Sequence, residues 1–172
     1  MQTRITRTLL FALAASLLLA SLSAKADSRN AYANASFSAS FNGTITTSSD
    51  RNDDNTSTDT YYSSEQGTLD DMVIVRTTDQ EMDVNYTSTD SYFDQLAKGL
   101  NASIANRTNN QWQGHPYTFG YLTYTSDNVK RACYQWVIVA NSKTVFLVSV
   151  DAPESDISID EWTALSQSLS IK

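Results

Sequence analysis

The fold is constrained most strongly by three strand-like segments near the C-terminal end of the chain. Short turns separate them. The segments are YTFGYLTYT at 117–125, RACYQWVIVA at 131–140 and TVFLVSV at 144–150. Aromatic and β-branched residues dominate them, as is typical of strands, and connections this short favour antiparallel pairing. The middle segment is apolar on both faces, so we expect it to be a central strand covered above and below.

Shorter strand patterns precede this set. FSASF at 37–41 alternates apolar and polar residues, and strand-like segments follow at 44–47, 60–66 and 70–78. Residues 48–60 (SSDRNDDNTSTDT) contain no apolar residue. We therefore expect a surface loop there.

Two other segments have the period of a helix. In residues 89–107, apolar side chains recur every three or four positions, at Phe93, Leu96, Leu100 and Ile104. The same spacing recurs at Ile159, Trp162, Leu165 and Leu169, and either Ser158 or Asp160 can be the N-cap of this second helix. The order of elements predicts an α+β domain with a central antiparallel β-sheet of about six to seven strands. Two main helices should flank this sheet as an α/β/α sandwich.

The N-terminal residues have the pattern of a cleaved secretory signal. Arg4 and Arg7 precede an apolar run of about 14 residues, and a small-x-small motif ends at Ala26. This run is shorter than the roughly 20 residues of a spanning helix, so we expect no membrane anchor after cleavage. We expect a signal peptide at 1–26, a flexible lead-in at 27–36 and a single domain at 37–172. The pattern is bacterial and predicts a periplasmic or extracellular protein.

Charge and cysteine content narrow the possible partners. The chain has a net charge of −7, and removing the leader, which holds three basic and no acidic residues, makes it −10. A chain this acidic repels phosphate backbones, so we expect no nucleic-acid partner. Cys133 is the only cysteine, which excludes an intramolecular disulfide, and we expect its side chain to be buried.

Several motifs together resemble the PsbP-like α/β/α sandwich. An F-x-x-x-F-x-G strand and turn opens the domain, a G-x-P turn precedes the three-strand set, and an L-x-x-S-L tail closes it. The residues that carry this resemblance are Phe37, Phe41, Gly43, Gly114, Pro116, Trp162, Ser168 and Leu169. The superfold includes the lumenal extrinsic protein of photosystem II, the Ran-binding nuclear import factor and many small exported bacterial proteins. It implies a binding or accessory role, since members are mostly non-catalytic.

The stretch QWQGHPYTFGYLTYT at 111–125 holds the only histidine, His115, between a glycine and a proline. We interpret this as a turn that starts a strand. The alternative is a nucleophile–base pair of His115 with Cys133 or a serine. Aromatic residues alternate here, and we predict that Trp112, His115, Tyr117 and Tyr124 line a binding surface.

The acidic segment offers a second candidate site. Asp50, Asn52 and Asp54 occupy positions 1, 3 and 5 of a calcium-loop pattern. The sixth and twelfth positions should be Gly and Glu, but they are Asn55 and Tyr61. We therefore expect a solvated acidic loop, with Ca²⁺ binding as the alternative.

The sequence thus predicts a small exported accessory or binding domain that is not an enzyme and needs no cofactor. Its expected partner is a protein, peptide or glycan of the cell envelope. Two alternatives stay open. One is a weak divalent-cation-binding exterior protein, and the other is a hydrolase or thiol enzyme that uses His115.

Overall fold

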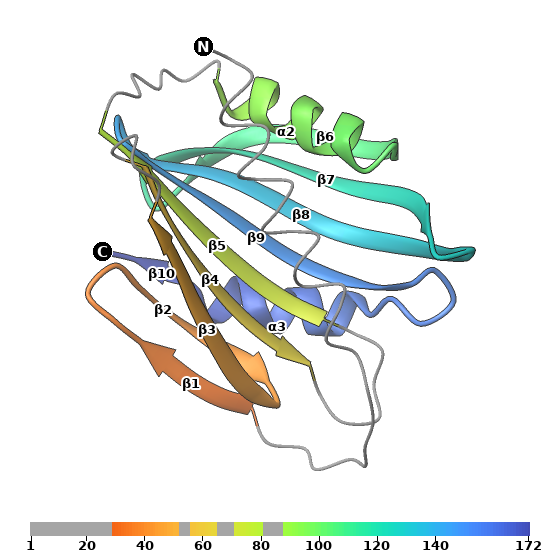
Figure 1. Cartoon of the computed structure of the whole chain (residues 1–172), viewed down its shortest axis with the longest axis horizontal. Helices are drawn as coiled ribbons and strands as arrows, with labels where there is room; N and C mark the ends of the chain where they lie inside the picture. Colours follow the sequence, from red (N-terminus) through yellow and green to blue (C-terminus); the bar gives the residue numbers. More distant parts are fainter. Residues whose placement is uncertain (1–28, 52–55, 65–70, 81–87) are drawn as a thin grey trace.

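The computed structural model of the protein describes residues 29–51, 56–64, 71–80 and 88–172. These residues form ten strands in two sheets together with two helices (Figure 1). The predicted signal peptide at 1–26 lies outside the described residues. Among the described helices, none is long and apolar enough to cross a membrane.

The larger sheet has seven strands, and every neighbouring pair in it is antiparallel. In spatial order the strands are β3 (Thr44–Arg51), β4 (Thr56–Ser64), β5 (Asp71–Asp79), β9 (Thr144–Pro153), β8 (Val129–Asn141), β7 (His115–Ser126) and β6 (Ser103–Trp112). The sheet therefore joins the β3–β4–β5 meander to the β6–β9 meander through the pairing of β5 with β9.

Two tight hairpins set the register of the second meander. Gln113 and Gly114, with φ of 52° and 83°, connect β6 to β7, and Asp127 and Asn128, with φ of 50° and 64°, connect β7 to β8. Two successive positive φ values define the turn that matches the twist of paired strands, and Gly, Asn and Asp adopt it readily. These turns fix which side chains of β6, β7 and β8 share a face.

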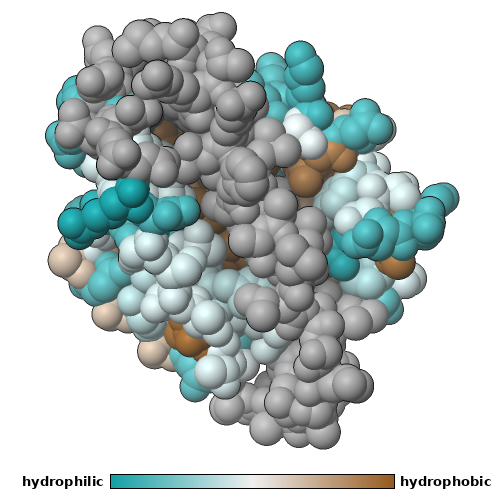
Figure 2. Space-filling model, viewed as in Figure 1, coloured by the Kyte–Doolittle hydropathy of each residue, from teal (hydrophilic) through white to brown (hydrophobic). Residues whose placement is uncertain are grey.

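Helix α2 (Ser88–Gly99) packs on one face of the larger sheet. Its Phe93 is fully buried, and the position of its ring leaves no room for a Cβ at Gly120 of β7. The guanidinium of Arg107 on β6 lies 5.5 Å from the centroid of the same ring. The described surface on this side is mostly hydrophilic, and hydrophobic residues show only in separate patches (Figure 2).

Asp90, in the first turn of α2, ties the helix to the sheet. It accepts hydrogen bonds from Arg107 Nε at 3.0 Å, Asn109 Nδ2 at 2.7 Å and Thr118 Oγ1 at 3.0 Å. Burial opposes ionisation of Asp90, but the hydrogen bonds from Arg107, Thr118 and Asn109 outweigh it and lower the pKa of the carboxyl. The helix therefore docks through an ionised side chain as well as through Phe93.

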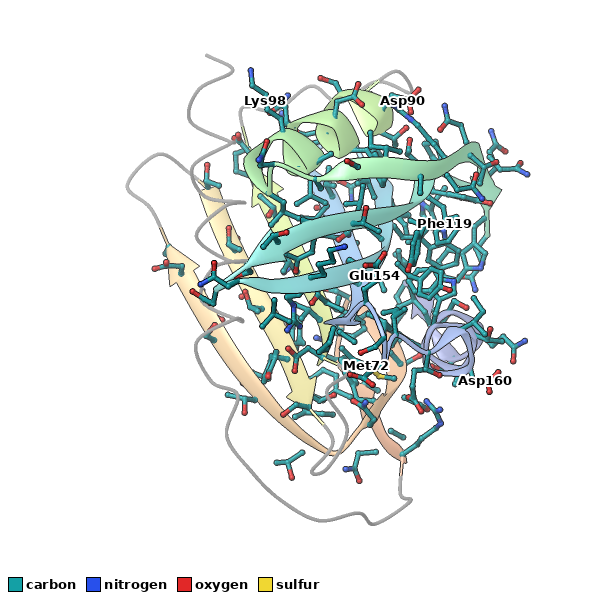
Figure 3. The ribbon with its side chains drawn as sticks, turned by 90° about the vertical axis from the view of Figure 1, so that its right-hand side faces the viewer. Met72, Asp90, Lys98, Phe119, Glu154 and Asp160 are labelled. Atoms are coloured by element: carbon teal, nitrogen blue, oxygen red, sulfur yellow. The ribbon has the colours of Figure 1, made fainter. Side chains whose placement is uncertain are left out.

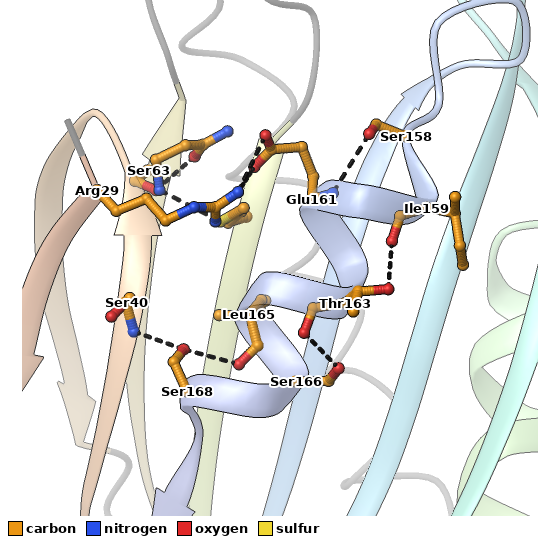
Figure 4. Close-up of polar contacts among 12 residues, drawn as sticks. Arg29, Ser40, Ser63, Ser158, Ile159, Glu161, Thr163, Leu165, Ser166 and Ser168 are labelled. Atoms are coloured by element: carbon orange, nitrogen blue, oxygen red, sulfur yellow. Dashed lines mark hydrogen bonds and ion pairs between the residues drawn. The ribbon is translucent and has the colours of Figure 1, made fainter. Parts of the chain in front are cut away.

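The opposite face carries a three-stranded sheet and the second helix. These elements are β1 (Arg29–Ala33), β2 (Phe37–Asn42), β10 (Ser170–Ile171) and α3 (Ile159–Ser168). Ser158, one of the two candidate N-caps, caps α3 by accepting a hydrogen bond from the Glu161 backbone N–H. Ser168 accepts a 2.8 Å hydrogen bond from the Ser40 backbone N–H, and Arg29 pairs with Glu161 at 3.2 Å (Figure 4).

The predicted central antiparallel sheet is confirmed, but the predicted arrangement around it differs. One face carries α2, whereas α3 shares the other face with β1, β2 and β10, so the protein is mostly β. Part of the predicted flexible lead-in, Arg29–Ala33, is ordered as β1 because it pairs along its full length with β2.

The segment after α2 was predicted wrongly as helix. The helix ends at Gly99, Asn101 adopts a left-handed φ of 51°, and residues from Ser103 form β6. A left-handed residue at this point is a common way for helices to end. Ile104 is 40% exposed rather than part of a helical core face. Strand β6 is polar and largely exposed, so it lacks the apolar alternation that identifies strands.

The predicted loop at 48–60 is also shorter in the structure. Strand β3 continues through Arg51 and β4 begins at Thr56, so that only residues 52–55 lie outside the described part. Ser49 pairs with Asp59 across the two strands, and its hydroxyl donates a 2.7 Å hydrogen bond to the Asp59 carboxylate. This end of the hairpin is built from polar side chains, with β3 exposed and β4 partly buried, so it lacks the apolar residues that identify strands.

Substitution of Gly120 tests the docking of α2. An alanine Cβ would overlap the Phe93 ring and lie 2.8 Å from the Asn106 carbonyl oxygen. We expect Gly120→Ala to lower the free energy of unfolding by about 1 to 3 kcal/mol in urea denaturation. In a Phe93→Leu background the same substitution should cost less, because the ring is gone. An equal cost in both backgrounds would contradict this packing.

Candidate functional site

All three tryptophans of the chain meet on the face of the sheet that carries α3. Trp112 ends β6, Trp136 lies in β8, and Trp162 lies in α3. The ring centroids of Trp112 and Trp136 are 5.4 Å apart, and those of Trp136 and Trp162 are 5.1 Å apart in an edge-on arrangement. These distances are typical of favourable aromatic pairs.

Four further rings extend this cluster across β7 and β8. Phe119 stacks on Trp162 with centroids 5.1 Å apart, Tyr121 contacts Tyr134 at 5.0 Å, and Tyr117 contacts Trp136 at 5.4 Å. In Figure 3 the rings crowd around the labelled Phe119, between strand β6 and helix α3. We call this set the aromatic surface; its members are Trp112, Tyr117, Phe119, Tyr121, Tyr134, Trp136 and Trp162.

The aromatic surface is only partly covered. Trp136 and Trp162 are 8% and 7% exposed, whereas the other five rings are partly exposed. Helix α3 packs mainly against β2 and β9, so β7 and the edge strand β6 extend beyond it. Contiguous apolar side chains of this size at the surface often mark an interaction site.

The structure brings together three of the four predicted surface residues. His115 lies directly across the β6–β7 hairpin from Trp112 and on the same face as Tyr117. Tyr124 is misplaced in the prediction: it lies on the opposite face, is 7% exposed and donates its hydroxyl to Asp151. Successive strand residues alternate between faces, and Tyr124 is an odd number of positions from Tyr117.

Sequence reasoning missed the part of the surface that comes from outside 111–125. Tyr134 and Trp136 alternate in β8, which is a recognisable signal, but the predicted burial of both faces of this strand hid it. Trp162 was assigned only to the apolar face of a helix. Its stacking on Phe119 depends on where α3 docks, which the helix pattern does not specify.

Cys133 does not form the alternative catalytic pair. Its side chain is 2% exposed on the α2 face, where it faces Leu122 across the β7–β8 ladder, whereas His115 lies on the aromatic face. Burial raises the pKa of the Cys133 thiol well above its ordinary value, and the nearby Asp151 raises it further. The thiol is therefore protonated and shielded, contrary to what a nucleophile needs.

A polar cluster lies near Cys133 on the α2 face. Asp71 and Asp151 are direct partners across β5 and β9, and the Arg131 guanidinium reaches both, with Nε 2.6 Å from Asp151 and Nη2 3.5 Å from Asp71. The Tyr62 and Tyr124 hydroxyls donate to Asp71 and Asp151, respectively. Each side-chain group thus has a partner, and the cluster joins five strands.

The two carboxylates share one cation, but burial still raises their pKa values. Burial raises the pKa of Asp71 to about 6, while the Tyr62 hydroxyl and Arg131 act in the opposite direction and Asp151 adds to the rise. Burial also raises the pKa of Asp151, against the effect of Arg131. The cluster links the strands, but burying its charges costs desolvation free energy, so it is not a strong source of stability.

The predicted calcium ligands are not assembled in the described structure. Asp50 lies in β3 opposite Thr58, while Asn52 and Asp54 lie outside the described residues. In the part of the chain that the structure describes, no three His, Cys, Asp or Glu side chains are grouped to hold a metal ion.

Comparison with known proteins shows a shared fold but does not assign the chain to a family. No family model matches the chain, and no curated protein matches it in sequence. Among solved structures, LpqN, involved in cell envelope biogenesis of Mycobacterium tuberculosis, has a TM-score of 0.51 and 12% identity, covering 76% of this chain and 85% of LpqN. At this identity the match shows a shared fold alone.

Two further structures have lower TM-scores. A protein of unknown function from Pseudomonas aeruginosa has a TM-score of 0.45 and 11% identity, with 64% of this chain and 85% of that protein covered. A protein from Bacteroides thetaiotaomicron has a TM-score of 0.47 and 9% identity, with 79% of this chain and 45% of that protein covered.

The polar cluster predicts a specific pH dependence of stability. Because the pKa of Asp71 rises from 3.8 in the unfolded chain to about 6 on folding, the folded state binds more protons between these values. Stability should therefore fall by about 2 to 3 kcal/mol as the pH rises from 4 to 7. The difference in unfolding free energy between the native chain and Asp71→Asn isolates this slope. Asp127→Asn, in an exposed turn, is the control, and a pH-independent difference for Asp71→Asn would refute the assignment.

The burial of Cys133 predicts an inert thiol. In the native protein at pH 8 we expect no reaction with dithionitrobenzoate over minutes, because the thiol is buried and protonated. After unfolding in guanidinium chloride, one thiol per chain should react. Reaction of the native protein at the rate of the unfolded chain would reopen the thiol-enzyme hypothesis.

Proposed function

We propose that this chain is a small, non-catalytic binding domain exported to the bacterial cell envelope, where it recognises its partner through the aromatic surface. The observation that carries the proposal is the contiguity of this surface. Seven rings from β6, β7, β8 and α3 meet on one face, and five of them are partly exposed.

The proposals of export and of an accessory role are supported by observations other than the aromatic surface. The pattern of residues 1–26 supports export. LpqN, which shares the fold, is involved in cell envelope biogenesis. We also propose that the domain belongs to the PsbP-like superfold, whose members are mostly non-catalytic. Catalysis by a His–Cys pair is disfavoured by geometry, because His115 and Cys133 lie on opposite faces of the sheet.

Single substitutions in the aromatic surface test the binding function. We expect the exported protein to co-sediment with the isolated envelope of its own bacterium. Tyr121→Ala should weaken this binding by about tenfold, because it removes a partly exposed ring from the contact. Tyr32→Ala is the matched control, since Tyr32 is a partly buried tyrosine in β1 whose ring contacts Phe37, Phe41 and Tyr61 rather than rings of the aromatic surface.

Circular dichroism would confirm that both variants fold. The proposal is wrong if the native protein does not bind the envelope, or if the Tyr32 and Tyr121 variants bind equally well.

A further inference from the structure

A row of uncharged polar side chains runs beside the aromatic surface on the edge strand β6. We call it the polar row; its members are Asn106, Thr108 and Asn110, and all three are exposed. They are the direct β-sheet partners of Tyr121, Phe119 and Tyr117, in that order. Each polar side chain therefore stands beside one ring of β7 on the same face of the sheet.

The spacing of this arrangement is regular. Residues two apart on a strand are separated by about 7 Å, and neighbouring strands lie about 5 Å apart. The β6–β7 hairpin thus repeats one motif three times along its length: an amide or hydroxyl next to an aromatic ring. The Asn110 Oδ1 accepts a 2.8 Å hydrogen bond from the Gln111 backbone N–H, which leaves its Nδ2 directed to solvent as a donor.

Apart from His115 at its turn end, the aromatic face of this hairpin carries no ionisable acid or base other than tyrosine. Strands β6 and β7 lie wholly within the described residues, and on this face they carry no Asp, Glu, Lys or Arg side chain. Arg107, the charged residue of β6, pairs with Asp90 and Asp94 of α2 on the opposite face. Outside the hairpin, the Glu154 carboxylate is near Tyr121: burial raises the pKa of the Tyr121 hydroxyl, and Tyr134 and Glu154 add to the rise. On the hairpin itself a polyanion would find no Lys or Arg, and the chain as a whole has a charge of −7.

The backbone contributes little to recognition on this face. The main-chain groups of β7 pair with β6 on one side and with β8 on the other. A ligand lying on the β7 rings and the polar row therefore meets mainly ring faces, amides and hydroxyls, with the edge of β6 beside them. A sugar ring matches this set, because its C–H face packs on an aromatic ring and its hydroxyls both donate and accept hydrogen bonds.

We infer that the ligand of the aromatic surface is an uncharged glycan of the envelope. Its sugar rings stack on Tyr117, Phe119 and Tyr121, and its hydroxyls bind the polar row. This inference rests on the proposed binding function and specifies the chemistry of the partner.

The three tryptophans provide a direct measurement, because all of them belong to the aromatic surface. Envelope polysaccharide, freed of protein by exhaustive proteolysis, is separated by anion exchange into neutral and anionic fractions. We expect the neutral fraction to change the tryptophan fluorescence of the exported protein saturably. If the neutral fraction has no effect, or if only the anionic fraction acts, the inference is overturned.

Substitutions in β6 link this signal to the polar row. Asn106→Ala and Asn110→Ala should each weaken binding of the neutral fraction about three- to tenfold, since each removes hydrogen bonds to the ligand. Asn109→Ala is the matched control, because Asn109 lies on the opposite face and binds Asp90. Equal affinities of the Asn106, Asn110 and Asn109 variants would overturn the role of the polar row.

A treatment of the envelope separates failure of this inference from failure of the proposed function. The protein should still co-sediment with the envelope after the envelope has been digested with protease. It should no longer do so after periodate oxidation of the envelope sugars. If binding is lost with protease and persists after periodate, the partner is a protein. The glycan inference then fails, while the binding function stands.

Discussion

The pairing of β5 with β9 is the constraint on which the rest of the structure depends. It joins two meanders that are separated in sequence by α2, β6, β7 and β8 into one sheet of seven strands. The two strands supply buried side chains to both faces, so each face has its own core. Without this pairing neither α2 nor α3 would have a continuous surface on which to pack.

The two faces of the seven-stranded sheet differ in character. The α2 face holds an apolar core closed by the Asp71–Arg131–Asp151 cluster, where each charged group has a buried partner. The other face places its aromatic residues on β7 and β8, and the short helix α3 covers only part of them. The fold thus separates a polar cluster that joins strands from a surface that is available to a partner.

Much of the sheet was predictable, because β7, β8 and β9 have strong patterns and short turns. The capping of α3 by Ser158 was also visible in the sequence, as one of two candidates. Strand β6 was not, since an exposed polar strand owes its conformation to its neighbour β7 rather than to its own apolar residues. Trp112, His115 and Tyr117 lie on one face, and their role in binding stays a prediction. The face of Tyr124 follows from strand alternation, which the sequence already shows, so its inclusion in the surface was avoidable. The place of Trp162 depended on how α3 docks, which is a property of the tertiary structure.

The three-stranded sheet has a consequence for the order of folding. Strand β2 lies between β1, from the start of the described chain, and β10, from its last residues, and the Lys172 backbone N–H bonds to the Ser36 carbonyl. Pairing across such a sequence separation is slow, because a long loop must close first. The three-stranded sheet is therefore complete only when residues 170–172 are available to β2, whereas the seven-stranded sheet ends at Pro153 and does not need them.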